Sequence, residues 1–152
     1  MVTKIENNKC GECTLCCELL PIPEIGKSEN VLCTDCTLKK GCNIYNERPE
    51  SCVNFDCLYI SSNEMELELR PDNCNVIFDM ITTKIYMALN HYNDPFAYEN
   101  KNVIDYIKKL NSQGISVITT SFTDTPNEFF LAEGHDKDIV WKIAMREYEK
   151  IK

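Results

Sequence analysis

The segment Cys10-Gly11-Glu12-Cys13-Thr14-Leu15-Cys16-Cys17 places four cysteines within eight residues. Thiolate sulfur is a soft ligand that suits zinc and iron–sulfur clusters. Two intervening residues let a tight turn direct both sulfurs at one ion. This spacing occurs twice in succession, at Cys10, Cys13 and Cys16. The segment therefore predicts a metal centre that orders the chain around it.

The surrounding region is unusually rich in cysteine as far as residue 57. Outside it lies only Cys74, and the nine cysteines within it are Cys10, Cys13, Cys16, Cys17, Cys33, Cys36, Cys42, Cys52 and Cys57. No helical or alternating apolar pattern is sustained here. Such a segment needs another source of order, and metal–sulfur bonds supply it because metal binding contributes directly to folding. We expect residues 1–60 to form a Cys-rich metal-binding region.

The composition of the whole chain limits its partners. A length of 152 residues suits one domain, and the formal net charge is −8. An acidic surface disfavours nucleic acid, whose phosphates are neutralised by Lys and Arg, and it disfavours anionic membranes. We therefore expect neither nucleic acid nor a membrane as a partner.

The first residues indicate a reducing compartment. Residues 1–10 contain no apolar core of a signal peptide, and no run reaches the roughly 18 apolar residues of a membrane-spanning helix. We expect a cytoplasmic protein, in which cysteines serve metal binding or redox chemistry rather than a disulfide framework.

Residues 61–152 predict a conventional α+β unit. Alternating apolar residues predict strands at 64–69, 74–80 and 85–89, the last two joined as a hairpin through Thr82-Thr83. Cys74 is expected on the apolar face of the second strand, as a core residue.

Helical periodicity appears twice in the same unit. Asp94-Pro95 is expected to open a helix that ends near Gly114, and a closing helix is expected from Asp136. Strands are expected at 115–120 and 128–132. The predicted fold class is α+β: an irregular metal-stabilised Cys-rich part packed on a small antiparallel sheet with two helices, in one integrated domain.

Two kinds of metal centre are compatible with the spacing. Three thiolates at successive two-residue intervals, with a fourth from afar, hold ferredoxin-type [4Fe–4S] clusters. Here Leu20-Pro21 stands where the ferredoxin run has its Cys-Pro. A remote fourth ligand is therefore needed, and the candidates are Cys36, Cys42, Cys52 and Cys57. We favour an iron–sulfur cluster slightly, because two consecutive steps of this kind are uncommon for a single zinc ion.

The zinc alternative uses the same residues differently. Cys10 and Cys13, or Cys13 and Cys16, pair with Cys33-x2-Cys36, close to the spacing of structural zinc sites. Two closed Zn²⁺ sites of four thiolates each, or a multi-zinc cluster with bridging thiolates, are both compatible. The adjacent residues Cys16 and Cys17 have side chains that diverge from the backbone. Either they serve two neighbouring centres, or one is a ligand and the other a small buried hydrophobe.

The motifs together resemble a known family. Residues 10–17, CGECTLCC, match the CxxCxxCC signature of the YkgJ-like cysteine-cluster family of zinc- or iron-chelating proteins, and residues 36–55, CTLKKGCNIYNERPESCVNF, resemble its later motif. The resemblance implies a metal-binding set, which is Cys10, Cys13, Cys16, Cys17, Cys36, Cys42 and Cys52. It implies Cys57 as an additional ligand, whereas Cys33 departs from the pattern.

No motif for catalysis accompanies the cysteines. His91 and His135 lie in no pattern with a nucleophile, and no phosphate-binding or dinucleotide fingerprint occurs. Three functions are therefore compared. The first is an iron–sulfur protein with an electron-transfer or accessory role. The second is a zinc-stabilised module that binds a protein partner. The third is a metal-dependent or modification enzyme.

Overall fold

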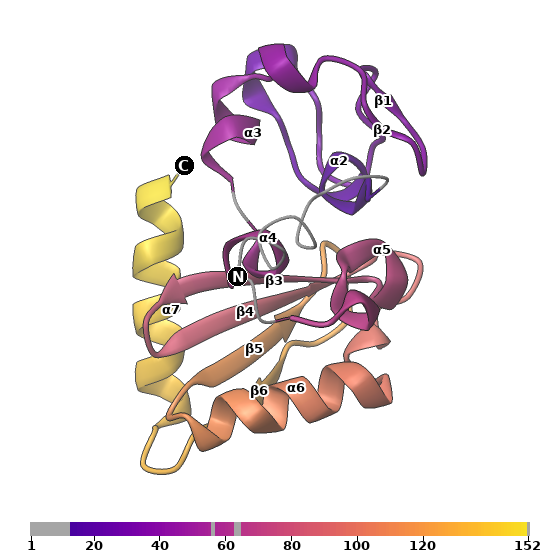
Figure 1. Ribbon diagram of the computed structural model, residues 1–152. Coiled ribbons are helices and arrows are strands. Elements are labelled where there is room, and N and C mark those ends of the chain that lie inside the picture. The colour runs from indigo at the N-terminus through magenta and orange to yellow at the C-terminus, as the bar shows by residue number, and fades with distance from the viewer. Residues whose placement is uncertain (1–12, 56, 63–64, 152) are drawn as a thin grey trace.

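The computed structural model describes residues 13–55, 57–62 and 65–151, and Figure 1 shows their arrangement. Residues 13–55 form a Cys-rich part, called the lobe below, which lies beside one edge of a four-stranded sheet. The two long helices belong to the sheet part. The chain is mixed α and β, as the sequence predicts.

The sheet has the strand order β3-β4-β5-β6. Its strands are β3 (Val76–Thr82), β4 (Ile85–Asn90), β5 (Ser116–Thr120) and β6 (Glu128–Phe130). The outer pairs are antiparallel, and the central pair β4–β5 is parallel. A parallel pair requires a long crossover, which helix α6 (Lys101–Ser112) provides. The expected small sheet is present, but it is not antiparallel throughout.

Each face of the sheet is covered by one long helix. Val103, Ile107 and Leu110 of α6 pack in one buried cluster with Phe78 and Val117. On the opposite face, α7 (Lys137–Ile151) contributes Val140 and Ala144 to a cluster with Ile85 and Ile118. Alternating strand residues thus face different helices.

The lobe is built of short elements, as its lack of periodicity predicts. They are α2 (Leu15–Leu19), η1 (Pro23–Ile25), β1 (Cys36–Thr37), β2 (Gly41–Cys42), η2 (Tyr45–Glu47) and α3 (Glu50–Asn54). Three further short elements connect the lobe to the sheet: α4 (Leu58–Ser62), η3 (Leu67–Leu69) and α5 (Pro71–Cys74). The 3-10 turn η4 (Ala97–Glu99) precedes α6.

Helix α2 anchors the lobe to the sheet. Its Leu15 and Leu19 pack against Ile77 of β3 and Leu89 of β4. Two polar contacts add to this packing. Asn30 Nδ2 donates to the Phe122 carbonyl oxygen at 3.0 Å, and Glu18 Oε1 lies 3.3 Å from His91 Nε2. The lobe therefore has direct apolar and polar contacts with the sheet part.

The hairpin, the helix before Gly114 and the closing helix are present as the sequence predicts, although the second of these begins later than expected. Strands β3 and β4 pair directly, with a register shift between Met80 and Thr82. The closing helix begins where it is expected, and Asp136 Oδ1 caps it by accepting from the Ile139 N–H at 3.0 Å.

The predicted strand at 64–69 is wrong within the residues described. Leu67–Leu69 form a 3-10 turn, and residues 63–64 lie outside the description. Leu67 is 58% exposed, whereas Met65 and Leu69 are buried. The alternating apolar residues therefore do not form one buried face of a strand.

Two predicted boundaries also differ. Cys74 ends α5 rather than lying within a strand, because Asn75 turns left-handed at φ 60°. Helix α6 starts after Asn100, whose side chain accepts from the Asn102 N–H, and not at Asp94-Pro95. Asn is a preferred N-cap residue, and the cap at Asn100 sets the start of the helix in place of Asp94-Pro95.

Candidate metal centre

Helix α2 and the loop after it bring distant cysteines together. The Cys33 N–H donates to the Cys17 carbonyl oxygen at 3.0 Å. The Cys36 N–H in turn donates to the Cys33 carbonyl oxygen at 3.1 Å, so Cys33 and Cys36 lie on one tight turn. Cys36 is also the strand partner of Cys42 in the β1–β2 hairpin. Backbone hydrogen bonds thus place Cys17, Cys33, Cys36 and Cys42 in one neighbourhood.

Helix α3 completes this group, which we call the lobe cluster: Cys17, Cys33, Cys36, Cys42 and Cys52. Cys17 and Cys52 pack against a small buried core made of Ile22, Cys33 and Cys36. Cys52 is positioned by the start of α3, where its N–H donates to the Pro49 carbonyl oxygen at 3.0 Å. The core of the lobe is therefore built mainly of sulfur.

The thiols of the lobe cluster influence each other. A hydrogen bond from the Cys16 side chain is the largest factor that lowers the pKa of Cys17 to about 6, with further contributions from Cys36 and from the positive charge of Lys27. Burial raises the pKa of Cys36 to about 12, and the negative charge of Cys17 adds to the rise. The arrangement favours a thiolate at Cys17.

Lys27 is a buried cation beside these sulfurs. The residue as a whole is only 9% exposed. Its ammonium donates to the carbonyl oxygens of Leu20 and Ser28. Burial lowers the pKa of Lys27, while the nearby Cys33, Cys17, Cys16 and Cys52 favour its charged form. A buried charge requires compensation, and sulfur anions are the available source of it.

Arg48 stabilises the turn before Cys52 through hydrogen bonds to backbone carbonyl oxygens. Its Nε donates to the Tyr45 carbonyl oxygen at 2.9 Å, and its Nη1 lies 3.5 Å from the Cys52 carbonyl oxygen. The guanidinium also stacks 4.1 Å from the centre of the Tyr45 ring. Arg48 thus holds the backbone that presents Cys52.

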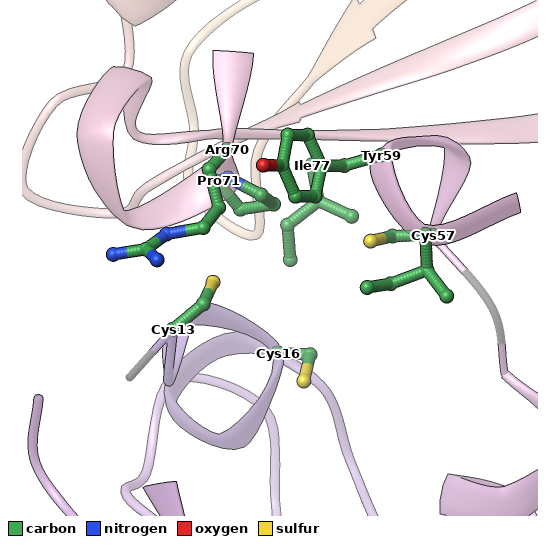
Figure 2. A pocket seen from close by; sticks show the side chains of 8 residues that line it. Cys13, Cys16, Cys57, Tyr59, Arg70, Pro71 and Ile77 are labelled. Atoms are coloured by element: carbon green, nitrogen blue, oxygen red, sulfur yellow. The ribbon is translucent and has the colours of Figure 1, made fainter. Parts of the chain in front are cut away.

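A second group of thiols lies between the lobe and the sheet. Cys13, Cys16 and Cys57 line one cavity, called the interface cavity below. Its other walls are Tyr59, Ile60, Arg70, Pro71 and Ile77. In Figure 2 the Cys57 sulfur points into the space, and the Cys13 sulfur, just before α2, projects towards Arg70. The Cys16 sulfur is turned away from the space.

The interface cavity is apolar with one charged wall. Burial raises the pKa of the Cys13 thiol to about 12. Arg70 binds Asp72 through two hydrogen bonds, at 2.6 Å and 2.7 Å, and both groups lie close enough to Cys13 to affect its charge. Burial disfavours the charged thiolate form here unless a cation neutralises it.

The predicted ligands are therefore divided between two places. The lobe cluster includes Cys33, and Cys13, Cys16 and Cys57 line the interface cavity. Cys10 lies outside the described residues. Cys74 is buried in the main core, where its Sγ is 3.4 Å from the Val76 carbonyl oxygen and 3.6 Å from that of Leu69. The prediction that Cys74 is a core residue is confirmed.

The donor chemistry suits a thiophilic metal, although the sulfurs are not closed around one point. Among the residues described, no three or more Cys, His, Asp or Glu side chains are already arranged to hold an ion. The cysteines of the lobe cluster are nevertheless mutual neighbours with a buried cation beside them. This combination fits zinc or an iron–sulfur cluster, both of which prefer thiolates.

Lys27 is the residue that sequence reasoning missed. It is an ordinary lysine in a loop that follows Pro23 and Gly26, and no local pattern marks it. Its burial results from the bridge between Ile22 and Lys27, which turns the chain back over α2.

The histidines and the helices add no further candidate site. His135 Nδ1 lies 2.5 Å from the oxygen of Ser116, which is fully buried and also accepts from the Ala132 N–H. The pair ties a loop to β5. Within the described chain, none of the helices combines the length and the apolar character needed to cross a bilayer.

Comparisons with known proteins identify no relative of this chain. The chain matches no family model, no curated protein and no solved structure.

Proposed function

We propose that this chain is a metal-binding protein that holds zinc or an iron–sulfur cluster through cysteine thiolates of the lobe cluster. The observation that carries the proposal is the burial of Lys27 among cysteines from separate segments of the lobe. The Lys27 ammonium has two backbone carbonyl acceptors, but neutral thiols do not balance its charge. A metal bound by four thiolates carries a net negative charge, and a buried cation stabilises it.

The composition of the lobe supports the same conclusion. Its described apolar core is small, since Ile22 and the cysteines form one cluster and Leu15 and Leu19 pack on the sheet. A fully buried apolar side chain contributes about 1.5–3 kcal/mol. A structural zinc ion contributes about 10–16 kcal/mol in small metal-folded domains. Metal binding therefore supplies order that this core alone does not.

The resemblance of residues 10–57 to the YkgJ-like family is consistent with this role. Cys17, Cys36, Cys42 and Cys52, which the resemblance implies as ligands, all belong to the lobe cluster. The sulfurs are drawn onto the metal as it binds, which couples binding to local closure of the lobe.

A second candidate is a zinc-stabilised module that binds a protein partner. Large apolar side chains are exposed on the lobe, namely Ile25, Val31, Leu32, Leu38, Tyr45 and Val53. Exposed apolar surface of this kind is common at interaction sites. Iron with acid-labile sulfide would exclude this second candidate, whereas zinc is compatible with both.

Metal analysis of protein purified without oxygen tests the proposal. An iron–sulfur protein is expected to be brown and to contain iron with acid-labile sulfide. A zinc protein is expected to be colourless and to contain zinc. The matched control is Cys74→Ser, which alters a buried cysteine outside both thiol groups and should keep the full metal content. Wild-type protein that is folded and free of both metals would refute the proposal.

Lys27→Met is expected to weaken metal retention about 10- to 100-fold, the usual range for a residue that supports the ligands without being one. Methionine keeps much of the length and apolar character of the side chain but removes the charge that balances the thiolates. Competition with a coloured chelator measures the affinity. Lys40→Met is the control because Lys40 is exposed. Equal affinity in the two variants would show that Lys27 does not neutralise the centre.

A further inference from the structure

The β1–β2 hairpin of the lobe holds two cysteines, Cys36 and Cys42, directly opposite each other. We propose that these two thiols form a reversible disulfide across the hairpin, and that its formation switches off metal binding at the lobe cluster. The switch rests on the proposed function, because it regulates the same cysteines. The disulfide itself follows from the geometry of the hairpin alone.

The register of the hairpin places the two cysteines at a non-hydrogen-bonded position. The Asn43 N–H donates to the Asp35 carbonyl oxygen at 2.7 Å, and these residues form the next pair outward. Hydrogen-bonded and non-hydrogen-bonded pairs alternate along an antiparallel ladder, so Cys36 and Cys42 fall at a position of the second kind. The Cys36 N–H is consistent with this, since its hydrogen bond goes to the Cys33 carbonyl oxygen in the preceding turn.

A non-hydrogen-bonded position is one at which a disulfide fits between two strands. Opposite residues there have Cα atoms about 4.5 Å apart and side chains on one face, and disulfides span Cα separations of roughly 4.4–6.8 Å. The turn keeps the strands in place, because the Lys40 N–H donates to the Thr37 carbonyl oxygen at 2.9 Å and Lys39 is left-handed at φ 61°. The hairpin therefore presents the two thiols to each other with no change in its backbone path.

Exposure distinguishes Cys42 from Cys33, the other cysteine whose backbone is tied to Cys36. Cys33 and Cys36 are both buried, at 7% and 8% exposed. Cys42 is half-buried, and its hairpin lies at the margin of the lobe (Figure 1). A dissolved oxidant therefore reaches Cys42 before either buried thiol. The Cys17 side chain also contacts Cys36, and the experiment below tells the two pairs apart.

Thiol–disulfide exchange forms the bond in two steps. The Cys42 thiolate attacks a sulfur of a low-molecular-weight disulfide such as oxidised glutathione, and one glutathione thiolate leaves. The Cys36 thiolate then attacks the Cys42 sulfur of the mixed disulfide and displaces the second glutathione. The two cysteines lose two protons and two electrons in all, and the two departing glutathione molecules take them up. Reduced glutathione restores both thiols by the reverse exchange.

Formation of this bond removes ligands from the lobe cluster. Cys36 and Cys42 are consumed, which leaves Cys17, Cys33 and Cys52. These remaining thiolates are fewer than the four of a closed zinc or iron–sulfur site. A bound metal in turn occupies the thiolates that the exchange needs. Metal binding and oxidation of the hairpin therefore exclude each other.

Equilibration of the metal-free, reduced chain with anaerobic glutathione buffers tests the inference. Free thiols are trapped with N-ethylmaleimide, and the linked peptides are identified by mass spectrometry. The expected product joins Cys36 to Cys42. With free Zn²⁺ buffered at about 100 times its dissociation constant, half-oxidation is expected to need a ratio of glutathione disulfide to squared glutathione about 100-fold higher, because only the reduced form binds zinc.

Two variants identify the pair. Cys42→Ser is expected to lose the linked product. Cys33→Ser is the matched control, because it removes the other cysteine tied to Cys36 and leaves the hairpin pair intact. It is expected to form the disulfide at the wild-type buffer ratio.

The possible results separate the disulfide, the switch and the proposed function. A product that joins Cys36 to Cys33 or to Cys17, or no disulfide at any buffer ratio, would overturn the hairpin pair. A Cys36–Cys42 disulfide whose midpoint does not move with bound zinc would overturn the switch alone. A reduced wild-type chain that binds neither zinc nor iron would overturn the proposed function and with it the switch, even where the disulfide forms.

Discussion

Replacing Cys17 by serine is expected to abolish metal binding at the lobe cluster and to release most of the lobe from its fold. Cys17 packs centrally, against Cys33, Cys36 and Cys52, and its backbone carbonyl accepts from the Cys33 N–H. Serine keeps the shape of the side chain but is a poor ligand for a thiophilic metal. The substitution therefore removes the coordinate bond and leaves the packing almost unchanged.

The size of the effect follows from what else holds the lobe. If the metal contributes on the order of 10 kcal/mol, its loss exceeds what Ile22 and the cysteine side chains supply by burial. Leu15 and Leu19 remain attached to the sheet through Ile77 and Leu89. We therefore expect the disorder to begin after α2 and to leave strands β3–β6 folded.

Metal analysis and amide hydrogen exchange measure the two parts of this prediction. Cys17→Ser should lose metal and should lose amide protection within residues 22–55, with protection retained in β3, β4 and β5. Cys74→Ser should behave as wild type in both measurements. A Cys17→Ser protein with wild-type metal content and a protected lobe would disprove the assignment of Cys17 as a ligand.

The sheet part was largely predictable from the sequence because its signals are local. Val76, Phe78 and Met80 recur at every second residue, and Val103, Ile107 and Leu110 recur at helical spacing. The parallel pairing of β4 with β5 was not predictable in the same way. It depends on how α6 crosses the sheet, and the lengths of the segments allow either direction.

The sequence predicts the cysteines as one set, but it does not predict which of them lie in the lobe cluster and which line the interface cavity. Spacing predicts Cys13, Cys16 and Cys36 as ligands, since a two-residue step can aim two sulfurs at one ion. It does not show that Cys36 lies opposite Cys42 on a hairpin, or that Cys57 meets Cys13 across a cavity. Those neighbours depend on the tertiary path of the chain. The adjacent pair Cys16–Cys17 was the one local sign that the thiols fall into two groups.

Lys27 illustrates a different limit. A buried lysine has no signature in composition or periodicity, because its burial depends on the fold of its neighbours. Charge compensation between distant parts of a chain can be recognised only when the three-dimensional positions of both charged groups are known. The same holds for Arg70 beside Cys13.

Phe78→Ala is expected to destabilise the sheet part by about 3–5 kcal/mol, the usual cost of removing a buried aromatic ring. Phe78 is 1% exposed and lies in the largest buried cluster, with its ring 5.1 Å from that of Tyr106 in an edge-on arrangement. The whole stability of a domain is typically about 5–15 kcal/mol, so this loss is a large fraction of it.

Urea unfolding followed by circular dichroism measures the change, with Met80→Ala as the matched control. Met80 is on the same strand but is 51% exposed, so its truncation should change the unfolding free energy little. Similar midpoints for the two variants would show that Phe78 does not support the core as its burial implies.

Metal content measured across the same unfolding transition separates the two sources of order in this chain. On the proposed function the lobe cluster depends on sulfur–metal bonds, whereas the sheet depends on apolar burial. In Phe78→Ala, metal should therefore stay bound at urea concentrations that already unfold the sheet. The Leu15 and Leu19 contacts with Ile77 and Leu89 are lost first, because they require the sheet to be present. Simultaneous loss of metal and sheet structure would mean instead that the lobe cannot hold its centre without the surface on which α2 rests.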